Sequence, residues 1–149
     1  MSLLAQIQAE IKSAMREGRK EDVAAYRLLA SELQRVAKDS RVDSLTEEEE
    51  RKVLVRERKK RLEAAEAFEK GGREELAAKE RRESRLIERF LPQPLTEEEM
   101  RALIEEAVKE TGASSSRDMG RVMGVVMARG GTRVDGKLAS RLVKERLSK

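Results

Sequence analysis

Apolar residues recur at helical spacing along most of the chain, so the pattern predicts helices separated by short polar or glycine-containing breaks. The first helix is expected to begin after Ser2, whose hydroxyl can cap it, and to close at Gly18. A second is expected from near Asp22 until the pattern fades in residues 39–44. The residues predicted to face inward are Leu3, Leu4, Ile7, Ile11 and Met15 in the first helix and Val23, Tyr26, Leu29, Leu33 and Val36 in the second.

Two longer helices are predicted on either side of Gly71 and Gly72. Thr46 followed by Glu49 matches a capping box, in which each side chain accepts a hydrogen bond from the other residue's backbone amide. One helix should therefore run from this box to about residue 70. The other should run from about residue 73 to residue 90, because Pro92 cannot continue a helix.

Both of these helices lose their apolar stripe in the middle, at residues 56–61 and 79–85, where most side chains are charged. In an antiparallel hairpin the two polar stretches lie opposite each other, so we expect water between them. Ion pairs one turn apart would support such an exposed arm. The alternative is a second basic surface for RNA, although neither stretch holds an aromatic residue for base stacking.

Residues 91–95 form the expected boundary to a second domain. Thr96 and Glu99 make another capping box, and the acidic helix that follows should stop at Gly112. Ser114 to Ser116 are expected to cap the next helix, which Gly130 and Gly131 end, and Asp135 should cap the last one. The apolar residues of these last two helices are Met119, Val122, Met123, Val126 and Met127, then Leu138, Leu142, Val143 and Leu147.

Gly120 and Gly124 lie one turn apart on the same face of the helix after Ser116. Each costs about 1 kcal/mol relative to alanine inside a helix, so a compensating contact is expected. Close packing of another helix is the favoured explanation, and close approach of a nucleic-acid backbone is the alternative. We therefore treat both as candidate close-approach glycines.

Composition agrees with long exposed helices, since 38% of the residues are hydrophobic, 42% are charged and only 2% are aromatic. The sequence predicts an all-α protein with a four-helix N-terminal region that includes a long helical hairpin, residues 1–92, and a C-terminal three-helix domain, residues 93–149. No membrane span or signal peptide is expected, and the predicted location is cytoplasmic.

The chain has no cysteine and no histidine, which excludes a thiolate nucleophile, a disulfide and the commonest general base. Glu47 to Glu50 hold oxygens suited to magnesium, but four successive helical residues point in different directions, and a helix-start acidic cluster is the favoured interpretation. Likewise Ser114 to Ser116 lack the lysine and paired-serine spacing of amidase sites. We expect no catalytic residue, no metal site and no cofactor.

Positive charge gathers at the end of the chain, where residues 113–149 hold nine Lys and Arg against three Asp and Glu. The total net charge is only +4, so the remainder is slightly acidic. Such a distribution favours an acidic partner. The candidate RNA-binding residues are Arg117, Arg121, Arg129, Arg133, Lys137 and Arg141.

The run at residues 118–124, DMGRVMG, with Gly112 to Ser114 before it and Asp135-Gly136 and Leu142-Val143 after it, resembles the signature of the GatB/YqeY family. Residues 90–96, FLPQPLT, and the N-terminal Ser2 to Leu4 extend the resemblance to free-standing YqeY proteins over almost the whole chain. The resemblance implies a C-terminal domain like the tail of the B subunit of tRNA-dependent amidotransferase, which amidates Glu-tRNA or Asp-tRNA. In that enzyme the tail contacts tRNA and the chemistry lies elsewhere.

The leading hypothesis is therefore a non-catalytic tRNA-binding or accessory protein. Amidotransferase subunits or an aminoacyl-tRNA synthetase are further expected partners, and neither membrane binding nor DNA specificity is expected. A helical protein-interaction adaptor is the alternative. A third possibility is carbon-nitrogen ligase activity, with glutamine as amido donor, as part of a complex.

Overall fold

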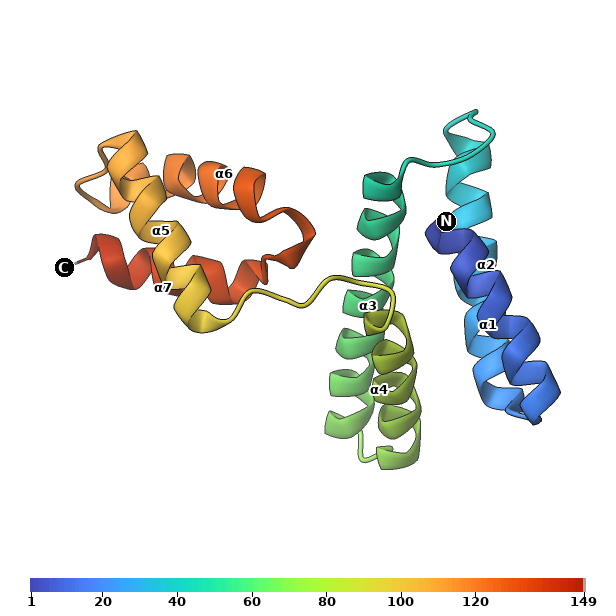
Figure 1. Cartoon of the computed structure of the whole chain (residues 1–149). Helices are drawn as coiled ribbons and strands as arrows, with labels where there is room; N and C mark the ends of the chain where they lie inside the picture. Colours follow the sequence, from blue (N-terminus) through green and yellow to red (C-terminus); the bar gives the residue numbers. More distant parts are fainter. Residues whose placement is uncertain (149) are drawn as a thin grey trace. The chain divides into compact units, whose positions relative to one another are not determined.

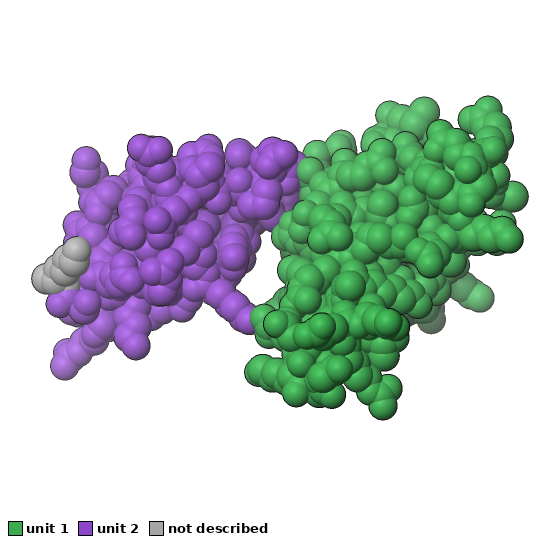
Figure 2. Space-filling model, turned by 90° about the horizontal axis from the view of Figure 1, so that it is seen from below, with its two compact units in different colours: residues 1–91 green, residues 92–149 purple. Residues whose placement is uncertain are grey.

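A computed structural model describes residues 1–148, which form seven α-helices and two short 3-10 turns. The fold is all-α, as predicted. The chain divides into two compact units, Met1–Leu91 and Pro92–Lys149, which are described separately (Figure 2). The first unit holds four helices and the second holds three (Figure 1). Among the described residues, none of the helices combines the length and apolar character that a bilayer crossing demands.

The first two helices of unit 1 are α1, Leu3–Glu17, and α2, Lys20–Asp39. Ser2 caps α1 as predicted, since its Oγ accepts a hydrogen bond of 3.0 Å from the amide of Ala5. Gly18 then adopts φ of 74°, a left-handed conformation that favours glycine and that turns the chain into α2. The second helix begins two residues earlier than predicted, and its first turn is supported by an ion pair between Arg19 and Asp22 at 2.7 Å.

Helices α3, Glu47–Lys70, and α4, Glu74–Glu88, lie side by side as the predicted long hairpin (Figure 1). The capping box of Thr46 and Glu49 forms at the start of α3, with bonds of 3.0 and 3.2 Å. At the other end Gly72 has φ of 75°, which permits the tight turn. Helix α4 ends two residues before the predicted Phe90.

The core of unit 1 is built from residues of all four helices. Tyr26 is fully buried there and packs edge-on against Phe90, with ring centroids 5.9 Å apart. Arg89 donates a hydrogen bond of 2.9 Å to the Tyr26 hydroxyl, so the polar atom of the buried ring is satisfied. The other members of this core are Leu3, Ile7, Leu29, Ala30, Leu33, Val53, Leu54 and Ile87.

The expectation of water between the two polar stretches of the hairpin is wrong on their inner side. Glu57, Glu83 and Ser84 are buried, and Arg61 bonds Glu83 across the hairpin with Nε and Oε2 3.1 Å apart. Only 15% and 11% of these two side chains are exposed. The helices approach closely because Ala65 and Ala77 are small and buried nearby along the hairpin. The polar middle is therefore packed as charge-paired contacts.

Unit 2 consists of α5, Glu97–Thr111, α6, Met119–Gly130, and α7, Gly136–Leu147, with 3-10 turns at Ser116–Asp118 and Gly131–Arg133. The predicted caps form at Thr96 and Asp135, and Gly112 closes α5 with φ of 67°. The three helices share one apolar core. Its most buried members are Met100, Ile104, Ala107, Val122, Val126, Ala139, Leu142 and Val143.

The serine segment differs from its prediction. Ser115 caps the 3-10 turn and not α6 directly, since its Oγ accepts a hydrogen bond of 3.3 Å from the amide of Arg117. In return Asp118 accepts hydrogen bonds from the amides of Ser114 and Ser115 at 2.9 and 3.3 Å. This reciprocal capping holds the turn closed, and α6 begins one residue after it, at Met119. Met127, which was predicted to face inward on α6, is 43% exposed.

Candidate nucleic-acid interface

The six candidate RNA-binding residues all lie in unit 2, and the structure separates them into paired and unpaired cations. Arg129 bonds Glu110 and lies 3.6 Å from Glu106, so a residue of α6 is tied to two carboxylates of α5. Arg133 lies 3.9 Å from Glu99 and donates to the carbonyl of Gln93 at 2.7 Å.

Arg141 of α7 is also paired. It lies 3.3 Å from Glu97 of α5 and 3.4 Å from Glu145 of its own helix. The sequence pattern assigns these basic residues to a partner, yet acidic side chains of the same unit already pair with them. The acidic helix before the basic end of the chain indicates that internal ion pairs are possible. Which residues pair depends on how the three helices pack.

Arg121 is paired within its own segment. Its guanidinium bonds Asp118, while the Ser114 amide and then Arg121 are the main causes that lower the pKa of the Asp118 carboxyl to about 2. The carboxylate therefore stays charged at any physiological pH. Arg121 also donates to the carbonyl of Thr111 at 3.5 Å, so part of its hydrogen-bonding capacity supports the loop before α6.

Arg117 and Lys137 differ from the other four. Both are exposed, and neither forms an ion pair within residues 1–148. Arg117 lies on the 3-10 turn before α6, and Lys137 lies in the first turn of α7. These two cations are available to an external anion without loss of an internal contact.

Gly120 and Gly124 are exposed, and a Cβ atom added at either position meets no atom of the described residues within 4 Å. Packing of another helix is the favoured explanation from the sequence, and within unit 2 no helix packs against these two glycines. The side of α6 that carries them is open because the core contacts of this helix come from Val122 and Val126. A close approach to Gly120 and Gly124 would therefore come from outside unit 2.

The glycine that does permit close packing is Gly130, which sequence analysis treated only as a helix end. A Cβ there would lie 2.1 Å from Cγ2 of Val134 and 3.3 Å from side-chain atoms of Leu95 and Leu103. The only sequence signal was its position beside Gly131. Such a contact spans the linker, α5 and the loop after α6, so it cannot be found from local periodicity.

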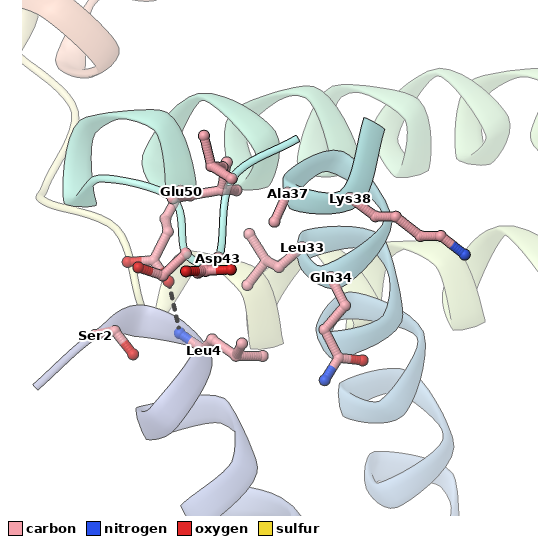
Figure 3. A pocket seen from close by; sticks show the side chains of 11 residues that line it. Ser2, Leu4, Leu33, Gln34, Ala37, Lys38, Asp43 and Glu50 are labelled. Atoms are coloured by element: carbon pink, nitrogen blue, oxygen red, sulfur yellow. Dashed lines mark hydrogen bonds between the residues drawn. The ribbon is translucent and has the colours of Figure 1, made fainter. Parts of the chain in front are cut away.

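Unit 1 contains a pocket of about 350 Å³ between the start of α1, the end of α2 and the start of α3 (Figure 3). Glu50 lines it and is only 3% exposed. Its carboxylate oxygens accept hydrogen bonds from the amides of Leu3 and Leu4 at 3.1 and 2.9 Å, which satisfies the free amides at the start of α1. Of the three charged residues that line the pocket, Lys38, Asp43 and Glu50, the buried Glu50 is therefore already engaged in a structural contact.

The only tyrosine and the acidic side chains of the described residues are candidates for catalytic groups or metal ligands. Tyr26 is the only tyrosine, and burial raises the pKa of its hydroxyl, which accepts from Arg89. Within residues 1–148, no group of three or more acidic side chains is placed to hold a metal ion.

Residues 92–149 hold eleven Lys and Arg against nine Asp and Glu, so the net charge of unit 2 is only +2.

The comparisons agree with the resemblance seen in the sequence. A search of the curated proteins found no match to the chain. The family model described as Yqey-like protein matches residues 4–147, which covers both units and includes every candidate residue named above. The chain therefore belongs to the YqeY-like protein family.

Proposed function

We propose that this protein is a non-catalytic accessory factor that binds tRNA through unit 2 and assists tRNA-dependent amidation. The observation that carries the proposal is that Arg117 and Lys137 are exposed and have no ion-pair partner within residues 1–148. The link to amidation rests on the resemblance of this unit to the tail of the amidotransferase B subunit. Family membership supports an accessory role of this kind.

The chemistry of the surface favours the RNA backbone over its bases. An arginine presents a planar set of donors to a phosphate, and a lysine adds a point charge. The open side of α6 at Gly120 and Gly124 leaves room for a sugar-phosphate chain to lie against the helix. Unit 2 has no aromatic residue, so bases have no ring on which to stack. Recognition of shape and charge is therefore expected.

The test compares two charge-reversal variants of the full chain. Arg117→Glu with Lys137→Glu should weaken binding of a tRNA mixture strongly. Lys52→Glu with Lys109→Glu makes the same change in net charge at two other exposed lysines that lack ion pairs among the described residues. If both cations reach phosphates, wild-type affinity should fall about tenfold between 50 and 200 mM salt, with a logarithmic slope of about −2.

Equal losses in the two variants would mean diffuse electrostatics without a site. No binding of tRNA by the wild type at 50 mM salt would favour the adaptor function. One observation already supports that alternative. Met127 is 43% exposed on the helix that carries the open glycines, a surface suited to a partner helix.

Carbon-nitrogen ligase activity remains the third possibility, as part of a complex. The isolated protein is expected to show no glutaminase or amide-transfer turnover, because it lacks cysteine and histidine and its only tyrosine is tied to Arg89. Sustained glutamine hydrolysis that one point mutation in this chain abolishes would contradict this expectation.

A further inference from the structure

The acidic side chains of α5 lie against the basic residues that the sequence assigns to RNA. We infer that the α5 carboxylates Glu97, Glu99, Glu106 and Glu110 compete with RNA phosphates for the arginines of unit 2 and so limit its affinity for RNA. This inference rests on the proposed function and adds that unit 2 itself lowers the affinity with which it binds RNA.

Arg129 shows the arrangement most clearly. It reaches from α6 to Glu106 and Glu110, which lie one turn apart on α5. Two carboxylates around one guanidinium resemble the oxygens that a phosphate would present. A phosphate that binds Arg129 must therefore share the guanidinium with these carboxylates or displace one of them.

The contacts are suited to exchange because all three side chains are solvent-exposed. The exposed fractions are 44% for Arg129, 66% for Glu106 and 51% for Glu110. Ion pairs at such positions are weak and are screened by salt. Helix α5 does not depend on them, since Met100, Ile104 and Ala107 anchor it in the apolar core. Removal of the carboxylates should thus leave the fold intact.

Glu98 supplies a matched control on the same helix. It is exposed, and it forms no ion pair or hydrogen bond within residues 1–148. Glu98→Gln and Glu110→Gln change the net charge equally, and only Glu110→Gln removes a carboxylate that contacts an arginine. A purely global effect of charge would strengthen RNA binding to the same extent in both.

The experiment measures binding of a tRNA mixture to the full chain at 50 mM salt, with circular dichroism to confirm the fold. Glu110→Gln should raise the affinity about 2- to 5-fold, which matches the typical strength of one exposed ion pair. Glu98→Gln should raise it less than about 1.5-fold. The double variant Glu106→Gln/Glu110→Gln should bind about 3- to 10-fold more tightly than the wild type, with a steeper salt dependence.

Addition of Arg129→Gln to the double variant should remove the gain, because the released guanidinium would be gone. A wild type that binds tRNA, with Glu98→Gln and Glu110→Gln equally improved, would overturn the inference and leave the proposed function standing. A double variant that binds although the wild type does not would support the inference in its strongest form. Absence of binding by both would overturn the inference and the proposed function together.

Discussion

Gly130 is the glycine at which the absence of a Cβ atom is required for packing. Its backbone has φ of −81° and ψ of −22°, so alanine would fit the conformation. The obstacle is steric, since Cγ2 of Val134 occupies the place of an added Cβ, at 2.1 Å. A branched valine that is itself 92% buried has little freedom to move away.

We therefore expect Gly130→Ala to lower the free energy of unfolding by roughly 1 to 3 kcal/mol through overpacking. Gly124→Ala is the control, because its Cβ meets open space and helix propensity should raise the stability by up to about 1 kcal/mol. Urea denaturation of both variants measures the difference. Similar stability changes in the two would show that the steric contact at Gly130 is relieved at no cost.

Asp118 makes the stability of the protein depend on pH in the acidic range. Its pKa in the folded state is about 2, below the ordinary value of 3.8, mainly because the Ser114 amide donates to the carboxylate. A lowered folded pKa means that the carboxylate contributes stability above about pH 4, and that this contribution is lost as the pH falls toward 2.

The expected result is that Asp118→Asn is less stable than the wild type near pH 6 and that the difference shrinks as the pH approaches 2. Urea midpoints at a series of pH values test this, and an NMR titration of the carboxyl should give a midpoint near 2. A difference in stability that stays constant down to pH 2 would contradict the assigned role.

The hairpin of α3 and α4 shows how charged helices can pack without an apolar stripe. Glu57, Glu83 and Arg61 replace hydrophobic residues at the contact, and the cross-hairpin pair of Arg61 and Glu83 is largely shielded from water. Glu80 also has a buried carboxylate oxygen without a hydrogen-bond partner in the described residues. The hairpin therefore contains polar groups that cost free energy to bury.

Arg61→Met should destabilise unit 1 by roughly 3 kcal/mol, because Glu83 would be left buried without its partner. Arg61→Met combined with Glu83→Leu should recover most of that loss or exceed wild-type stability, since two apolar side chains avoid the cost of desolvation. Thermal unfolding of the single and double variants tests the coupling. Additive losses in the double variant would show that the ion pair does not govern this contact.

The two units have separate apolar cores, one from α1 to α4 and the other from α5 to α7. Each core is made of residues from its own unit alone, and the caps of α5 and α7 are internal to unit 2. A domain of about 60 residues is near the lower limit for independent folding, and many of that size do fold.

Residues 92–149 expressed alone should therefore be helical and should unfold cooperatively, with near-ultraviolet or NMR signals of a packed core. Circular dichroism during heating measures this. A broad, non-cooperative transition would show that unit 2 requires residues 1–91 to reach its fold.

Local chemistry in the chain is sufficient to predict most of the helices and their ends. Ser2, Thr46, Thr96 and Asp135 act through residues at most three positions away, and Gly18 and Gly112 end their helices by their own backbone conformation. The helical period also identifies most of each core, because a buried face needs an apolar residue every turn.

Contacts between distant segments could not be predicted in this way. Glu50 bonds amides 46 and 47 positions away, Gly130 is crowded by the linker and α5, and Arg141 meets Glu97 across 44 positions. A periodic pattern says that a side chain faces a neighbour but not which one, because the neighbour depends on how the helices pack. For the same reason the sequence identifies the six candidate cations of unit 2, whereas the packed helices show that four of them are paired and that Arg117 and Lys137 form no ion pair among residues 1–148.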